Sequence, residues 1–289
     1  MTNYEVQDFF HSATATLTYI VSNPATKDAI IIDPVWDFDF STGKLADDAV
    51  AQYRQYLEEK KLRVLAVVES HIHADHISSA QRLKNLYPDI KVGVSSRVKE
   101  VMEVFSKTFS ETYTLSDFDF VFSDREHLVF GGIEIDIIST PGHTPACTSI
   151  KIGEMLFVGD SIFMPDFGTG RCDFPLGSAE NLYDSIREKI YTLPESTQIF
   201  VGHDYQPGGR ELCFQTSVGE QKKKNVHIRA DTKKEDFVKF REARDANLPT
   251  PKLLLPSIQL NLRAGKLPEQ DSAGKSFIKI PLSIKEKHD

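Results

Sequence analysis

Four side chains of the types that bind metal ions lie close together in the segment His71–His76, which reads HIHADH. Imidazole nitrogens and carboxylate oxygens together suit zinc or iron. The chain has nine histidines in 289 residues, so chance seldom places three of them beside an aspartate in one hexapeptide. The segment therefore predicts a metal site with the pattern H-x-H-x-D-H.

Three more residues of ligand type follow glycines at the ends of predicted strands. His143 comes after the strand-like residues 134–138, Asp160 after 155–158, and His203 after 199–201. A glycine before each of them permits a sharp turn and a close approach of the backbone. The repetition of strand, glycine and ligand type predicts that these residues join the hexapeptide in one site.

The hexapeptide itself must be positioned by the apolar run that precedes it. Residues 64–68 are short, continuous and largely β-branched, which is typical of a buried strand. Side chains alternate along an extended chain, so His71 and His73 can face the same side. Asp75 and His76 then fall on the turn into a helix that begins near Ser78.

Hydrophobic periodicity predicts the remaining elements. Residues 16–22 and 29–32 are expected to pair as strands, and residues 37–43 to form a polar, Asp-rich connection. Amphipathic helices are expected over 45–57 and 98–109, and another from Ser178. A second sheet is expected from the strands 119–122, 127–130, 133–138, 147–152 and 155–158. We expect one domain over residues 1–289, with 205–268 as a C-terminal flap on it.

Composition excludes several classes of function. The formal charge of -8 and the pI near 5.6 argue against a nucleic-acid surface, which needs a basic footprint. No apolar run approaches the roughly 20 residues that span a bilayer, and the N-terminus lacks the pattern of a secretory signal. The three cysteines are widely spaced and odd in number, which indicates reduced thiols. We therefore expect a cytoplasmic enzyme with no membrane or nucleic-acid partner.

The ordered motifs HIHADH, PGHT, GDS and GHD resemble those of the metallo-β-lactamase superfamily. This resemblance implies an α/β (α+β) fold, the four-layer αββα sandwich, with the metal site at one edge between the sheets. Within the superfamily the chain is similar to the persulfide dioxygenases (sulfur dioxygenases), through stretches such as VGDSIFMPDFGTGRCDF and VGHDYQPGGRE. The similarity runs from about residue 16 to 268. Extra length in 37–62 and 205–230 resembles the longer bacterial branch.

The dioxygenase resemblance implies one Fe(II) held by His71, His143 and Asp160. Two histidines and a carboxylate leave coordination positions open, which suits O2 activation. The implied reaction oxidises glutathione persulfide with O2 to sulfite and glutathione, in sulfide detoxification. The remaining ligand-type residues would then orient the ligands by hydrogen bonds instead of binding iron. They are His73, Asp75, His76 and His203.

The same resemblance implies substrate residues. Arg171 and Asp173 match the loop that contacts glutathione, and an arginine beside an aspartate complements the carboxylates and ammonium of that tripeptide. Tyr205 matches a tyrosine whose hydroxyl points at the metal pocket, which gives it a catalytic role. Arg263 would supply another carboxylate partner. A homodimer is compatible with this interpretation.

A different occupancy of the same residues gives a different chemistry. His71, His73 and His143 could hold one zinc, and Asp75, His76 and His203 a second, with Asp160 bridging them. A hydroxide between two zinc ions would attack a thioester, as in a hydrolase of the glyoxalase II type. A purely structural zinc is disfavoured, because structural sites are closed. The residues alone leave both occupancies open, and the resemblance favours iron.

Overall fold

The computed structural model describes residues 4–282, in which two six-stranded sheets face each other. In the first sheet β1, β2 and β3 pair antiparallel, and β3, β6, β8 and β9 run parallel. The strands in spatial order are β1 (Glu5–His11), β2 (Thr16–Ser22), β3 (Asp28–Ile32), β6 (Arg63–Val68), β8 (Lys91–Ser95) and β9 (Phe120–Phe122). The expected strand pair 16–22 and 29–32 is thus confirmed, and β1 adds an edge strand that the sequence analysis missed.

The second sheet is antiparallel except where β13 pairs with β14. Its strands in spatial order are β10 (His127–Phe130), β11 (Ile133–Ser139), β12 (Thr148–Ile152), β13 (Met155–Phe157), β14 (Gln198–Phe200) and β15 (Gln215–Ser217). The prediction that 119–122 begins this sheet is wrong. Strand β9 pairs with β8 in the first sheet, because the chain crosses between the sheets only after Phe122.

A small third sheet lies beside the predicted metal loop. Its strands in spatial order are β5 (Lys44–Ala46), β4 (Val35–Asp39) and β7 (Ile77–Ser78). The expected polar connection over 37–43 includes the end of β4 and the turn of a β-hairpin, in which Phe38 pairs with Leu45. Since β7 follows His76 directly, this hairpin is anchored to the end of the metal loop.

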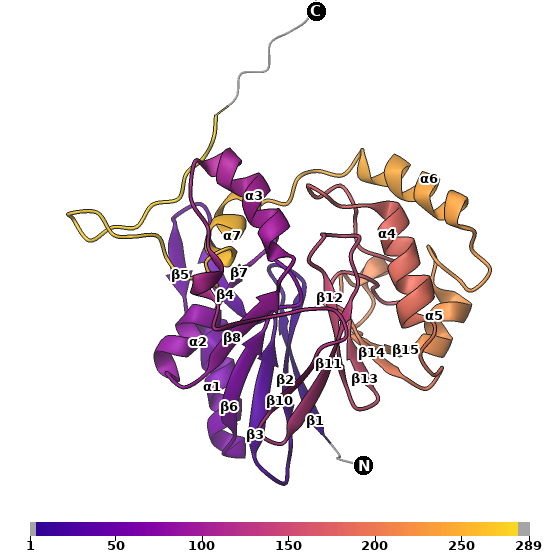
Figure 1. Cartoon of the computed structure of the whole chain (residues 1–289), viewed down its shortest axis with the longest axis horizontal. Helices are drawn as coiled ribbons and strands as arrows, with labels where there is room; N and C mark the ends of the chain where they lie inside the picture. Colours follow the sequence, from indigo (N-terminus) through magenta and orange to yellow (C-terminus); the bar gives the residue numbers. More distant parts are fainter. Residues whose placement is uncertain (1–3, 283–289) are drawn as a thin grey trace, which may run out of the picture.

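Helices cover the outer face of each sheet (Figure 1). On the first sheet lie α1 (Asp48–Lys60), α2 (Ala80–Leu86) and α3 (Val98–Phe109). On the second lie α4 (Ala179–Asp184), which continues as a π-helical segment over Ser185–Ile190, α5 (Val218–Lys224) and α6 (Lys234–Asp245). The helix α7 (Leu254–Asn261) packs near β7. The predicted four-layer αββα sandwich is confirmed. None of the helices in the described part of the chain combines the length and apolar character needed to cross a bilayer.

Alternation along β2 shows how the sequence builds these layers. Leu17, Tyr19 and Val21 point inward and join the core between the sheets, whereas Ile20 packs outward in the cluster that contains Val50 of α1. Both faces of the strand are buried, and its apolar residues Leu17, Tyr19, Ile20 and Val21 are divided between the two faces. The ends of these strands deliver the polar loops to one edge of the sandwich.

Candidate metal centre

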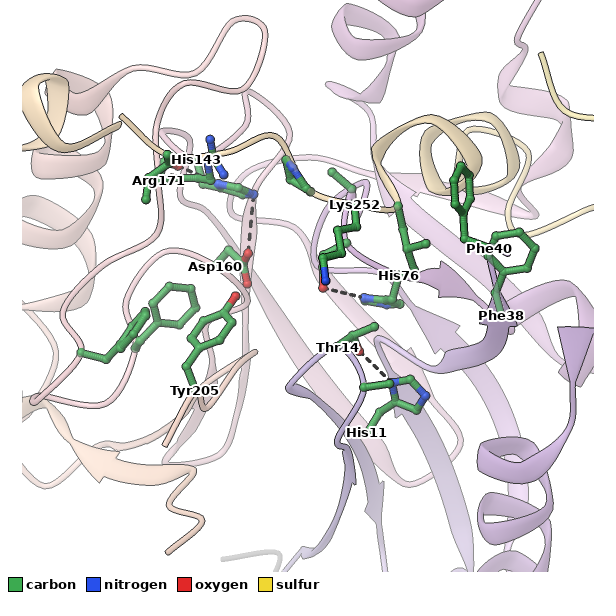
Figure 2. Close-up of a pocket in the computed structure, with 18 of the residues that line it drawn as sticks. His11, Thr14, Phe38, Phe40, His76, His143, Asp160, Arg171, Tyr205 and Lys252 are labelled. Atoms are coloured by element: carbon green, nitrogen blue, oxygen red, sulfur yellow. Dashed lines mark hydrogen bonds and ion pairs between the residues drawn. The ribbon is translucent and has the colours of Figure 1, made fainter. Parts of the chain in front are cut away.

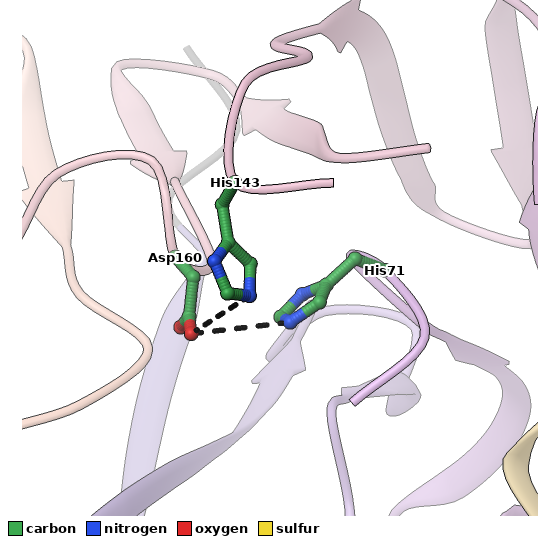
Figure 3. A group of neighbouring side chains, drawn as sticks. All are labelled: His71, His143 and Asp160. Atoms are coloured by element: carbon green, nitrogen blue, oxygen red, sulfur yellow. Dashed lines mark ion pairs between the residues drawn. The ribbon is translucent and has the colours of Figure 1, made fainter. Parts of the chain in front are cut away.

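His71, His143 and Asp160 converge from three separate strand ends (Figure 3). They follow β6, β11 and β13, and their ligand atoms lie within 4.8 Å of one another. The Nε2 atoms of His71 and His143 are 3.9 and 3.5 Å from Oδ2 of Asp160. Among the described residues, His71 Nε2 and Asp160 Oδ1 are buried and have no hydrogen-bond partner. Buried polar atoms are rarely left unsatisfied, so this donor set fits a cation.

The other ring nitrogens of the site histidines are held by protein acceptors. Nδ1 of His143 lies 2.7 Å from the Arg171 carbonyl oxygen, and Nδ1 of His203 lies 3.1 Å from the Ala15 carbonyl oxygen. A proton on Nδ1 leaves the Nε2 lone pair directed at the centre of the site. Burial, and then the neighbouring His73, lowers the pKa of His71 well below its ordinary value. A neutral imidazole is the form that binds a metal ion.

A second group of ligand atoms adjoins the first. Ligand atoms of His73, Asp75 and His76 also lie within 4.8 Å of one another. Nε2 of His203 lies 3.4 Å from Asp75 Oδ2 and 3.3 Å from Asp160 Oδ1, so Asp160 stands between the two groups. Burial, and then His73, lowers the pKa of His76 to about 4, and its Nε2 has no partner in the described residues. These atoms could hold a second ion.

His73, however, is engaged by two carboxylates behind the site. Its Nε2 lies 3.1 Å from Asp33 Oδ1 and 3.4 Å from Glu69 Oε2. Burial alone would lower the pKa of His73, but Asp33 and Glu69 raise it well above its ordinary value. Neither ring nitrogen of His73 has a hydrogen-bond partner among the described residues. The ligand atoms of His73 group with those of Asp75 and His76, separately from the group His71, His143 and Asp160.

Glycines let the loops of the site approach one another, as the sequence predicted. Gly159 has φ +49°, and a Cβ there would lie 2.6 Å from Ser70 Oγ. A Cβ on Gly170 would lie 2.0 Å from the Asp160 carbonyl oxygen. Both distances are far inside van der Waals contact, so a larger residue would displace Asp160 or its neighbours.

The site opens into a cavity of about 840 Å³ (Figure 2). His76, His143 and Asp160 lie at its base, and Tyr205 lines one side with its hydroxyl turned toward Asp160. The Tyr205 ring stacks on His203, with centroids 5.4 Å apart and an interplanar angle of 12°. Tyr205 as a whole is 46% exposed, but loss of water around its hydroxyl, and then the carboxylate of Asp160, raises its pKa above the ordinary value. The hydroxyl is therefore a proton-bearing hydrogen-bond donor at neutral pH.

The predicted substrate residues lie in three different settings. Arg171 lines the cavity, but each of its three nitrogens already donates to the protein: two to Asp173 at 2.6 Å and one to the Pro249 carbonyl oxygen at 2.8 Å. Asp173 is not among the residues that line this cavity. Arg263 also lies outside it, 3.0 Å from Glu111 and over the ring of Tyr113.

Three buried residues of the C-terminal segment hold the site loops, and sequence reasoning missed all of them. Asn261, at the end of α7, bonds the backbone of the metal loop at the His73 and His76 carbonyl oxygens. Arg241 pairs with Asp245, which accepts the backbone N–H of Cys172 at 2.7 Å. The last two share the face of α6 that carries buried Phe237, a helical spacing that could have revealed them. Through these contacts, segment 205–268 positions both loops.

Comparison with known proteins places the chain among its relatives. Residues 12–203 match the Metallo-beta-lactamase superfamily. The chain is 42% identical over 284 residues to Glyoxylase B2 of Dictyostelium discoideum, covering 96% of this chain and 97% of that protein. It is 29% identical over 262 residues to the mitochondrial persulfide dioxygenase ETHE1 of Homo sapiens, covering 90% and 88%.

A solved structure agrees with these similarities. The crystal structure of ETHE1 from Myxococcus xanthus has a TM-score of 0.74 and 29% sequence identity, covering 91% of this chain and all of that one. Fold, ligand motifs and overall similarity lead to the same conclusion: the chain belongs to the metallo-β-lactamase superfamily.

Proposed function

We propose that this chain is an iron-dependent persulfide dioxygenase, which converts glutathione persulfide, O2 and water to glutathione, sulfite and two protons. The observation that carries the proposal is the separation of His73 from the group His71, His143 and Asp160. Two histidines and one carboxylate form a set that leaves positions open for both reactants. The similarity to the persulfide dioxygenase ETHE1 supports the same activity.

The residues around the site would bind and orient the reactants. A bound Fe(II) would supply the redox chemistry that activates O2. The protonated hydroxyl of Tyr205 would donate a hydrogen bond to a developing negative charge on sulfur or oxygen. Phe163 and Phe167 line the cavity beside Tyr205 and would keep water from the reacting sulfur.

A zinc-dependent thioester hydrolase of the glyoxalase II type is the second candidate. The group His73, Asp75 and His76 favours it, because these residues with His203 could hold a second ion beside the first. Asp160, whose carboxylate lies near histidines of both groups, would help to hold both ions. The similarity to Glyoxylase B2 also supports a hydrolase.

Metal analysis combined with two activity assays tests these functions. We expect protein purified without oxygen to hold about one iron per chain, by the open-site argument, and to consume O2 when glutathione persulfide is added. Two zinc ions per chain, with turnover of S-lactoylglutathione and no O2 uptake, would refute the dioxygenase and favour the hydrolase.

A substitution at the shared carboxylate tests the ligand set. Asp160→Ala should abolish both iron binding and O2 uptake, because it removes the only carboxylate of the group. Asp231→Asn, at a surface side chain that is 82% exposed, is the matched control and should change neither. Iron content and O2 uptake that survive Asp160→Ala would remove Asp160 from the ligand set.

A further inference from the structure

Four basic side chains line the cavity, and they fall into two classes. Arg171 and Arg241 are each paired with an aspartate and fix the protein's own loops. Arg244 and Lys252 have no acidic partner within residues 4–282. Arg244 comes from the end of α6, and Lys252 comes from the segment 246–253 that follows it.

Arg244 is held partly out of water with its hydrogen-bonding capacity unused. Its Nε is buried and has no partner among the described residues. Its guanidinium lies 6.0 Å from the ring centroid of Phe167, another residue of the cavity wall. Within residues 4–282 no acidic group pairs with this guanidinium, which therefore keeps an uncompensated positive charge at the cavity wall. Lys252 extends from the neighbouring segment toward the centre of the same cavity (Figure 2).

The carboxylates of the cavity are committed elsewhere. Asp39 accepts hydrogen bonds from Ser41 and Thr42 in its own turn. Asp75 and Asp160 lie among the histidines at the base of the cavity. The charges of Arg244 and Lys252 are therefore available to a negatively charged ligand that reaches down to the metal centre.

We propose that Arg244 and Lys252 form the subsite that binds the carboxylates of the substrate's thiol carrier. Arg171, which is paired with Asp173 and also donates to the Pro249 carbonyl oxygen, instead holds the loop next to His143. The inference rests on the proposed function in one respect only: the substrate is a glutathione conjugate. Both the dioxygenase and the hydrolase would use such a conjugate, so the subsite does not depend on which reaction occurs.

Binding of S-methylglutathione to the metal-loaded protein tests this subsite without turnover, because the ligand has no free thiol. Isothermal titration calorimetry should show binding that weakens as NaCl is raised. Arg244→Gln and Lys252→Gln should each raise the Kd about tenfold or more, the size expected for loss of one charge-assisted hydrogen bond. Arg244→Lys, which keeps the charge, should retain most of the affinity.

Two controls separate charge recognition from general damage. Lys239→Gln removes the same charge from an exposed position of α6 and should leave the Kd within twofold of the wild-type value. The diethyl ester of S-methylglutathione lacks both carboxylates, so it should bind weakly to the wild-type protein and equally weakly to the Arg244 and Lys252 variants. Metal content should be unchanged in all of them.

Three results would overturn the subsite. They are absence of binding of S-methylglutathione by the wild-type protein, a Kd within twofold of wild type in both glutamine variants, and an equal loss of affinity for the acid and the diester. Salt-sensitive binding that depends on Arg244 and Lys252, in a protein that consumes no O2, would instead retain the subsite and refute only the dioxygenase.

Discussion

Replacement of Asn261 by alanine should destabilise the metal loop from a distance. The side chain is 4% exposed, and its amide nitrogen donates to the carbonyl oxygens of His73 at 2.9 Å and His76 at 2.8 Å. Its amide oxygen accepts the backbone N–H of Ser78, also at 2.8 Å. One side chain therefore closes the loop on both sides of Asp75.

The expected size of the effect follows from these three bonds. A hydrogen bond contributes about 1 kcal/mol net, so Asn261→Ala should cost roughly 3 kcal/mol of unfolding free energy. For a chain of this size that corresponds to a fall in Tm of roughly 6 to 12 °C. The same loop carries the proposed ligand His71, so we expect the metal affinity to fall as well.

Urea unfolding and metal titration of the same preparations measure both effects. The free energy of unfolding should fall in the metal-free protein as well, because the hydrogen bonds act on the backbone. Asn247→Ala is the control: that exposed side chain bonds only the Ala243 carbonyl oxygen. Substitutions at neutral surface sites typically change the free energy of unfolding by about 0.5 kcal/mol or less. A change that small in Asn261→Ala would refute this account of the loop.

Three further predictions follow from other parts of the fold. Gly170→Ala should lower metal content, measured by mass spectrometry, because the new Cβ would meet the Asp160 carbonyl oxygen at 2.0 Å. Burial opposes ionisation of Asp28, but hydrogen bonds from Arg63 and from the backbone N–H of Gly132 lower the pKa of Asp28 below 3.8. Its stabilisation is therefore present above pH 3.8 and lost below, so Asp28→Asn should destabilise at pH 7 by an amount that shrinks as pH falls. Iodoacetamide at pH 8 should modify exposed Cys213 before Cys172, because burial raises the pKa of Cys172 to about 12.

Each of these predictions has a contrary outcome. Full metal content in Gly170→Ala would show that the loop yields without moving Asp160. A stability difference between wild type and Asp28→Asn that is constant from pH 7 to pH 2 would exclude the ionised carboxylate as its source. The folded protein is labelled and the modified cysteines are then identified by peptide mapping. Labelling of Cys172 at the same rate as Cys213 would contradict the burial of the Cys172 thiol.

The sequence by itself determined the ligand types and the layers of this protein. His143, Asp160 and His203 could be assigned to one site with the hexapeptide because each follows a predicted strand and a glycine. The choice of His71, His143 and Asp160 as one ligand set came from the family resemblance. Alternating and continuous apolar runs likewise predicted most strands. These signals are local: they depend on neighbours within a few positions of the chain, which the sequence shows directly.

Only the tertiary structure decided which partners these side chains meet. His73 resembles its neighbours in the hexapeptide, yet its partner Asp33 approaches from another strand. Asn261 reaches the carbonyl oxygen of His73 across 188 positions of the chain. Arg171 and Arg263 were predicted to bind substrate. Arg171 donates to the Pro249 carbonyl oxygen across 78 positions of the chain, and Arg263 pairs with Glu111 across 152 positions. Which donor meets which acceptor depends on packing between distant segments, and periodicity carries no information about such pairings.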